Sequence, residues 1–223
     1  MFRILMLGSG LFWTLTYLLI IRRGVLDKTY GMPLVALCAN LSWEFIFSFV
    51  HPHPSIQRPV DIVWLALDVV ILLQLLRYGP REFADLSRGI FYSAFGLALV
   101  TSFCSVLFIS YEFNDLDGTY AAFGQNLLMS VLFIAMLYRR RSLRGQSTWI
   151  AVCKLVGTAL ASLAFYRYTA VAERSILLSF LFGAILVYDS IYLGLVLLLR
   201  RAAAATREPA AVQEHGGARA VIP

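Results

Sequence analysis

Two acidic residues lie within apolar stretches that are long enough to cross a membrane. Glu44 stands in "NLSWEFIFSFV" and Asp189 stands in "ILVYDSIYLGLVLLL". A charge at bilayer depth costs roughly 2.5–3.5 kcal/mol on insertion scales, so such residues normally face the interior of a helix bundle. Burial favours the neutral, protonated form of a carboxyl group. Both residues are therefore candidate proton donors or acceptors.

A neutral carboxylic acid in an apolar cavity can protonate a greasy substrate. Protonation of an alkene or an epoxide makes a carbocation, which cyclises when the cavity excludes water. A carboxylate and aromatic faces can stabilise that cation. Aromatic residues accompany both acids in the sequence, and we expect them to surround the acids: Trp43, Phe45, Phe47, Tyr188 and Tyr192.

Helical spacing gives Glu44 its neighbours. Asn40 lies one turn before it, and Phe47, Ser48 and His51 continue the same face. Asn40 would orient the carboxyl group of Glu44 as a donor. The alternative is a neutral carboxyl group that only bonds a neighbouring helix.

Asp189 lies at a different depth from Glu44. It should sit about 10 Å deeper in the membrane, at 1.5 Å per helical residue. Two carboxyl groups at different depths could flank an elongated substrate. The alternative for Asp189 is a structural pair with Lys154 or an amide.

Four more polar residues lie in apolar runs. Asp68 occupies the third and shortest run, so it should be less deeply buried than its position suggests. Lys154 is about six residues into the sixth run and can extend its ammonium group to the headgroups. Gln125 and Asn126 can serve equally as substrate-binding groups or as contacts between helices.

The composition is that of a polytopic membrane protein. Of 223 residues, 60% are hydrophobic and 14% are charged, against roughly 25% charged in an ordinary soluble domain. The mean hydropathy is +0.75. The basic residues stand between apolar runs and form no stripe with interleaved aromatics, so a nucleic-acid partner is not expected.

Seven runs are long enough, or nearly so, to be membrane helices. The predicted fold is an all-α bundle of seven transmembrane helices within residues 1–201, followed by a polar tail, 202–223, that we expect to be disordered. The first run is read as a retained span because it ends on two arginines. The predicted spans are 4–21, 31–50, 60–76, 89–111, 119–138, 148–166 and 176–199.

The basic residues predict the orientation. Of the 19 Lys and Arg residues, 14 fall in the loops after the first, third and fifth runs and in the tail, and four fall in the segments on the other side. This bias places the N-terminus outside and the C-terminus in the cytoplasm.

No cofactor or metal is expected. The three cysteines lie in apolar runs without metal-binding spacing. The chain lacks an aspartate-rich segment that would hold magnesium and diphosphate, and it lacks a glycine-rich phosphate loop. A mechanism that ionises a diphosphate therefore lacks its usual equipment.

Three segments carry a resemblance to a known family. "NLSWEFIFSFV", "GTYAAFGQNLLMSVLFI" and "YDSIY" resemble segments of the small seven-span membrane terpene cyclases. These enzymes act in fungal meroterpenoid and indole-diterpene pathways, such as those to pyripyropene and paxilline, and related bacterial enzymes cyclise farnesylated indoles. The resemblance covers nearly the whole chain in span number and length.

The resemblance implies an activity and a site. It implies protonation-initiated cyclisation of a prenylated aromatic, of the farnesylindole type, with Glu44 and Asp189 as the catalytic acids. Expected partners are the bilayer, an upstream prenyltransferase and, for an epoxide substrate, an epoxidase. A bacterial cytoplasmic membrane is the expected location. The residues expected to bind the substrate are Asn40, Trp43, Phe47, Asp68, Gln125, Asn126, Tyr188 and Tyr192.

Two other functions compete with the cyclase. A small proton-coupled transporter could use Glu44 and Asp189 as a relay, although such proteins more often show internal repeats and broken helices, which the sequence lacks. A signalling or scaffold protein would leave the buried acids unexplained.

Overall fold

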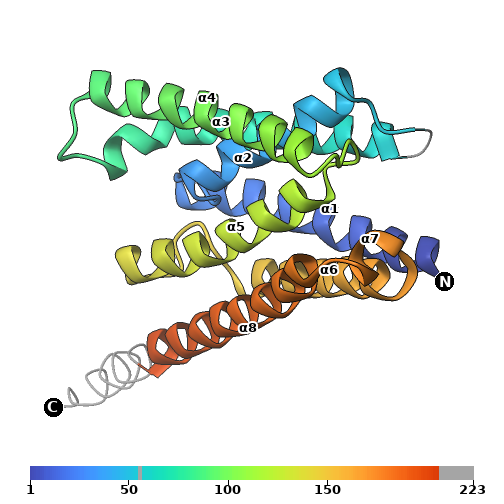
Figure 1. Cartoon of the computed structure of the whole chain (residues 1–223). Coiled ribbons are helices and arrows are strands. Elements are labelled where there is room, and N and C mark those ends of the chain that lie inside the picture. The colour runs from blue at the N-terminus through green and yellow to red at the C-terminus, as the bar shows by residue number, and fades with distance from the viewer. Residues whose placement is uncertain (55–56, 206–223) are drawn as a thin grey trace, which may run out of the picture.

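The computed structural model describes residues 1–54 and 57–205, and within these ranges every regular element is a helix (Figure 1). This confirms the all-α membrane bundle. Six helices are long and apolar enough to span a membrane, and Leu34–Val50 is a shorter apolar element. The helices are α1 (Phe2–Asp27), α2 (Leu34–Phe45), η1 (Ile46–Val50), α3 (Gln57–Glu82), α4 (Arg88–Glu112), α5 (Thr119–Arg140), α6 (Thr148–Tyr168), α7 (Ala170–Glu173) and α8 (Ile176–Ala205).

The spanning helices form a closed series of neighbours. Each packs against the next in the order α1, α3, α2, α4, α5, α8 and α6, and α6 returns to α1. The short α2 also packs against α5. In Figure 1, α3 and α4 lie along one side of the bundle and α6 and α8 along the other, with α1 and α5 between them. Side chains from α1, α2 and α5 can therefore meet inside.

Close helix contact depends on two glycines. Gly157 of α6 faces α1, where an added Cβ would lie 3.0 Å from the Trp13 ring. Gly118 precedes α5 with φ 64, a left-handed conformation that glycine adopts without strain. A Cβ there would lie 2.2 Å from the Phe47 ring, so a larger residue at 118 would displace that ring.

The prediction that the third span is the shortest is wrong. α3 has 26 residues, from Gln57 to Glu82, whereas α2 has 12 before its π-helical extension. The polar start of α3 is held by side-chain bonds: Arg58 Nε donates to the Ser48 carbonyl at 3.0 Å, and Gln57 Nε2 donates to Asp61 at 2.8 Å. At its other end, α3 continues past the predicted run to Glu82.

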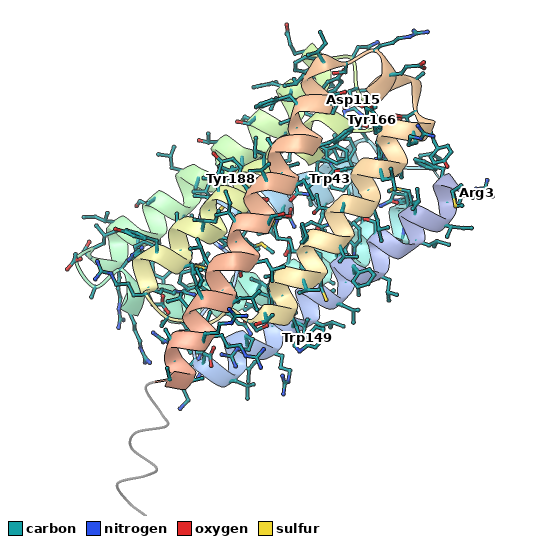
Figure 2. All side chains as sticks on the ribbon, turned by 90° about the horizontal axis from the view of Figure 1, so that it is seen from below. Arg3, Trp43, Asp115, Trp149, Tyr166 and Tyr188 are labelled. Carbon is teal, nitrogen blue, oxygen red and sulfur yellow. The ribbon has the colours of Figure 1, made fainter. Side chains whose placement is uncertain are left out.

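The basic loops gather at one end of the bundle. Arg140 bonds Glu82 at 2.7 and 3.0 Å, and Arg144 Nε donates to the Asp27 carbonyl at 3.2 Å. The loops after α1, α3 and α5 thus meet. Figure 2 shows Asp115 and Tyr166 toward one end and Trp149 toward the other. Which end faces the cytoplasm stays a prediction.

The last helix continues beyond the predicted domain end. α8 extends to Ala205, four residues past 201. Residues 206–223, which hold most of the predicted disordered tail, lie outside the described part of the chain.

Candidate active site

Glu44 is held in a buried cluster of five side chains from four helices. Its Oε1 accepts a hydrogen bond from the Tyr17 hydroxyl at 2.8 Å. Asn40 Nδ2 donates both to the Tyr17 hydroxyl and, at 3.1 Å, to Asp68 Oδ2. Gln125 Nε2 donates to Asn40 Oδ1 at 3.3 Å. We call this set, Tyr17, Asn40, Glu44, Asp68 and Gln125, the Glu44 cluster.

Two carboxyl groups share this cluster. Glu44 is 2% exposed and Asp68 is fully buried, so the prediction that Asp68 lies at a shallower depth is wrong: α3 is longer than its apolar run suggested. The two carboxyl groups are linked through the Tyr17 hydroxyl group and Asn40 Nδ2. Neighbouring buried carboxyl groups do not readily ionise together, and the cluster contains no basic side chain. The arrangement favours keeping a proton.

Asp189 is held in a second buried cluster that contains a cation. Lys154 Nζ lies 2.6 Å from Asp189 Oδ1, and it also donates to Ser130 Oγ at 2.7 Å and to Asn126 Oδ1 at 3.1 Å. Asn126 Nδ2 donates to Thr158 Oγ1 at 3.1 Å. We call this set, Asn126, Ser130, Lys154, Thr158 and Asp189, the Asp189 cluster.

The prediction that Lys154 extends to the headgroups is wrong. Its side chain is fully buried and pairs with Asp189, which is 1% exposed. Lys154 faces the bundle interior, where three oxygen acceptors and the Trp13 ring, 5.7 Å away, surround its ammonium group. The alternative of an Asp189–Lys154 pair is therefore what the structure contains.

The two clusters are adjacent through α1 and α5. Gln125 belongs to the Glu44 cluster and the next residue, Asn126, to the Asp189 cluster. On α1, Trp13 contacts Lys154 and its ring lies 6.1 Å from that of Tyr17. Each acid also keeps one buried oxygen, Glu44 Oε2 and Asp189 Oδ2, without a hydrogen-bond partner among the described residues.

The predicted aromatic surroundings are only partly present. Tyr192 is fully buried, with its ring 5.2 Å from Phe133. By contrast, Tyr188 is 38% exposed and Phe45 is 45% exposed on the outside of the bundle, so these two do not surround the acids. Figure 2 shows Tyr188 along the middle part of α8.

Trp43 and Phe47 form a separate aromatic group near the end of α2. Trp43 Nε1 donates to the Gly118 carbonyl at 3.0 Å, and the Trp43 and Phe47 rings lie 4.9 Å apart. Both rings pack on His53, at 5.5 and 5.0 Å. Hydrogen bonds thus tie Trp43 to the α4–α5 loop, and neither ring bonds to the Glu44 or the Asp189 cluster.

Tyr17 and Trp13 are functional candidates that the sequence reasoning missed. The stretch "FWTLTYLLI" puts them four residues apart on one face of α1. Their signal is weak because Trp and Tyr are common in membrane helices. Only its hydrogen bonds with Asn40 and Glu44 of α2 distinguish Tyr17 from other tyrosines.

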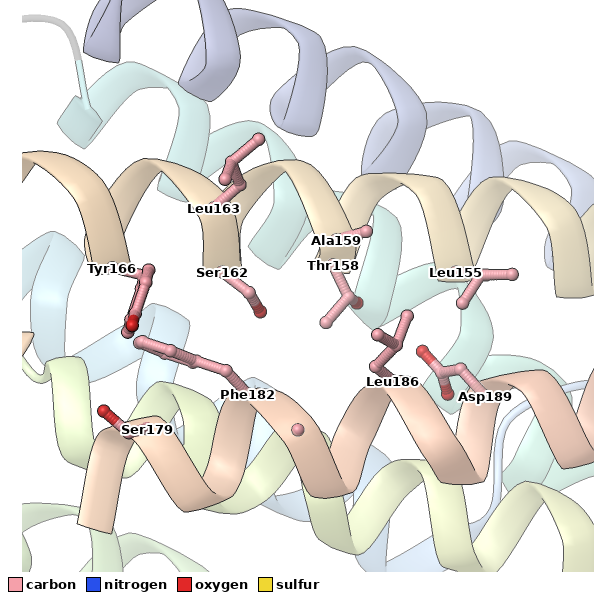
Figure 3. Close-up of a pocket in the computed structure, with 11 residues that line it drawn as sticks. Leu155, Thr158, Ala159, Ser162, Leu163, Tyr166, Ser179, Phe182, Leu186 and Asp189 are labelled. Atoms are coloured by element: carbon pink, nitrogen blue, oxygen red, sulfur yellow. The ribbon is translucent and has the colours of Figure 1, made fainter. Parts of the chain in front are cut away.

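A cavity of about 300 Å³ lies between α6 and α8 and contains Asp189. Figure 3 shows Asp189 and Leu155 at one end of it and Tyr166, Phe182 and Ser179 at the other. The lining is mostly apolar, with hydroxyl groups between. It comprises Leu155, Thr158, Ala159, Ser162, Leu163, Tyr166, Ser179, Phe182, Gly183, Leu186 and Asp189.

Across residues 1–54 and 57–205, no group of three or more His, Cys, Asp or Glu side chains could hold a metal ion. The chemistry available to the two clusters is therefore that of their acids, amides, hydroxyl groups and one lysine.

Comparison with known proteins identifies related sequences. The sequence profile of the Pyr4-like transmembrane terpene cyclases matches residues 1–202. The chain is 31% identical to the Pyr4-family terpene cyclase mfmH of Annulohypoxylon moriforme, over 74% of this chain and 70% of that protein. It is 28% identical to the terpene cyclase pyr4 of Aspergillus fumigatus, over 71% and 67% of the two chains. It is 27% identical to the terpene cyclase nodB of Hypoxylon pulicicidum, over 85% and 82%. No solved structure matches the chain.

Proposed function

The chain belongs to the Pyr4-like transmembrane terpene cyclase family, and from this premise we propose that it cyclises the isoprenoid chain of a farnesylated aromatic compound, of the indole type. The enzyme class and the membrane setting follow from the family. The substrate, the protonation step and the site residues are the proposal.

One observation carries the mechanism: the two acids lie in different electrostatic surroundings. Glu44 sits with a second carboxyl group and no basic side chain in its cluster. It is therefore suited to hold a proton and to donate it to an alkene or an epoxide as a general acid. Tyr17 and Asn40 orient it.

Asp189 is suited to the complementary role. Lys154 holds it as a carboxylate at 2.6 Å. A fixed carboxylate can stabilise the developing cation and accept the proton that is lost at the end of the reaction. Glu44 gives the substrate one proton at the start and Asp189 takes one at the end, so product and substrate are isomers. Before the next turnover Asp189 must release its proton and Glu44 must regain one. No metal or cofactor takes part in this scheme.

The proposed pathway follows from this substrate. A prenyltransferase must first join a farnesyl group to the aromatic ring, and an epoxidase must act before cyclisation if the substrate is an epoxide. The relatives named above are all called terpene cyclases, which favours the enzyme over the alternative of a proton-coupled transporter. A bacterial cytoplasmic membrane stays a prediction, and these fungal relatives lend it no support.

The test is to feed substrates to membranes that contain the full chain. We expect 3-farnesylindole or its terminal epoxide to be converted to cyclised isomers, identified by mass spectrometry and NMR, and membranes without the protein serve as the control. If properly inserted protein converts no prenylated aromatic, the proposal is wrong. Substrate-dependent proton flux in sealed vesicles would then support the transporter.

A further inference from the structure

The cavity between α6 and α8 opens toward the bilayer and ends at the acid. Leu163 and Leu186 on its rim are 49% and 50% exposed on the outside of the bundle, whereas Asp189 is 1% exposed. Thr158, which also lines the cavity, accepts a hydrogen bond from Asn126 of the Asp189 cluster. A lipophilic molecule that entered from the membrane would thus meet the Asp189 cluster directly.

A polar recess adjoins the other end of the cavity. It lies around α7 and has a volume of about 670 Å³. Tyr166 and Ser179 line both spaces, so the two adjoin at these residues. The recess adds a charged and hydrogen-bonding surface through Arg167, Thr169 and Glu173.

This pair of spaces is complementary to an amphiphilic molecule. Ligand pockets of about 300–1,000 Å³ are typical, and they combine an apolar lining with a few polar groups. The narrow apolar part fits a flexible hydrocarbon chain, and the recess fits a more polar head. The hydroxyl groups of Thr158 and Ser162 are uncharged, so either can lie beside a double bond of such a hydrocarbon chain.

Building on the proposed function, we propose that the α6–α8 cavity is the binding site for the isoprenoid chain of the substrate. The isoprenoid chain enters from the bilayer, and its aromatic head lies toward the α7 recess. Its distal isoprene unit extends past Asp189 toward the adjoining Glu44 cluster, where it is protonated. Gly183 of α8 and Ala159 of α6 are small residues in the lining of the cavity.

Gly183 allows a specific test because a Cβ built there meets nothing within 4 Å. A Gly183→Leu substitution should fill the cavity without straining the backbone. Gly194 is a matched control: it is on the same helix, a Cβ there also meets nothing within 4 Å, and it does not line the cavity. Gly194→Leu should behave like the unsubstituted protein.

Two measurements test binding in the cavity separately from the cyclase activity. First, a farnesylindole that carries a diazirine on its distal isoprene is photolysed in membranes containing the full chain, and the labelled peptides are mapped by mass spectrometry. We expect labels on α6 and α8, with Gly183→Leu reducing them about tenfold or more and Gly194→Leu leaving them unchanged. Second, Gly183→Leu should raise the KM for 3-farnesylindole to a similar extent.

Each outcome has a distinct meaning. Labelling at the cavity that Gly183→Leu abolishes supports the site even if no cyclised product forms, in which case only the proposed function fails. Turnover with labels elsewhere, and an unchanged KM in Gly183→Leu, overturns the cavity and leaves the function standing. Labelling of the cavity by a diazirine phospholipid that farnesylindole does not displace identifies a lipid site and also overturns the proposal.

Discussion

The Glu44 and Asp189 clusters differ in one component, a buried cation. Both place a buried carboxyl group among amide and hydroxyl groups. In the Asp189 cluster, Lys154 compensates the acid at 2.6 Å. The Glu44 cluster contains instead a second buried acid, Asp68, and no basic side chain. One site is thus arranged to keep a negative charge and the other to keep a proton.

Under the proposed function, this difference lets one residue type serve two roles in one reaction. A carboxyl group becomes a donor or a base according to its partners, and pairs with divergent surroundings identify acid and base assignments. Each prediction below changes one partner and asks whether the two clusters respond differently.

The largest difference is expected between the two acids themselves. Glu44→Gln should reduce turnover by about 10²–10⁴-fold, the usual contribution of a general acid, while stability changes little because an amide can still bond Tyr17. Asp189→Asn should reduce both turnover and stability because it leaves Lys154 buried without its counter-charge. Product formation and unfolding in detergent measure the two effects. If Glu44→Gln and Asp189→Asn reduced stability equally, the proposed electrostatic difference between the two clusters would be wrong.

Removal of the cation is the next largest change. Lys154→Met should destabilise the protein by about 3–5 kcal/mol, the usual cost of breaking a buried ion pair from one side. The double substitution Asp189→Asn/Lys154→Met should recover most of this loss, since neither charge is then left alone. Unfolding free energies of the four proteins form a double-mutant cycle. Additive effects would show that the pair contributes nothing.

A smaller effect is expected from the hydroxyl group that orients Glu44. Tyr17→Phe removes the hydroxyl group that donates a hydrogen bond to Glu44 and accepts one from Asn40. Buried polar atoms are then left unpaired, at a cost of about 1–3 kcal/mol. We also expect a lower kcat, with KM nearly unchanged, because the donor is less well oriented. Trp13→Phe is a matched substitution on the same face of α1, without a hydrogen bond to lose. A Tyr17→Phe enzyme with wild-type kcat would contradict the positioning role.

The smallest effect is expected outside the membrane spans, at His53. Burial lowers the pKa of this imidazole, but hydrogen bonds to Asp61 and to the Asp117 carbonyl outweigh burial, so the pKa is raised overall. The folded protein then binds the proton more tightly than the unfolded chain does. The stabilisation is full below the ordinary pKa of histidine and is lost as the pH rises through the raised pKa.

A pH series tests this contribution. Unfolding measured between pH 5 and 9, a range of roughly two units on either side of neutrality that covers histidine titration, should show a decline for the unsubstituted protein and a flatter curve for His53→Asn. Glu44→Gln should keep the decline, since it leaves His53 in place. A decline of the same size in His53→Asn would assign the pH dependence to another group.

The sequence was sufficient to predict the fold class and part of the Glu44 cluster. Long apolar runs predict helices reliably, because only helices satisfy their own backbone in lipid. Polar side chains in such runs turn inward, which accounts for the convergence of Asn40, Asp68 and Gln125 on Glu44. The inward preference does not say which polar residues meet, so their grouping into two clusters was not predictable.

The direction of the Lys154 side chain could not be predicted from the sequence. A lysine one and a half turns into a span can extend to the headgroups or turn inward to an acid, and the choice depends on helix rotation. The pairing partner, Asp189, is 35 residues away on another helix. The length of α3 was also not predictable from hydropathy, because its first turn is polar and is bonded through the side chains of Arg58 and Gln57.

The side chains of adjacent residues on a helix point in directions about 100° apart, and this holds for Gln125 and Asn126 of α5. The two amides are rigidly joined by one peptide unit, yet each bonds a different cluster. Rotation of α5 about its own axis would therefore move both amides in the same sense. A substrate that displaced α5 would change the hydrogen bonds of both clusters at once.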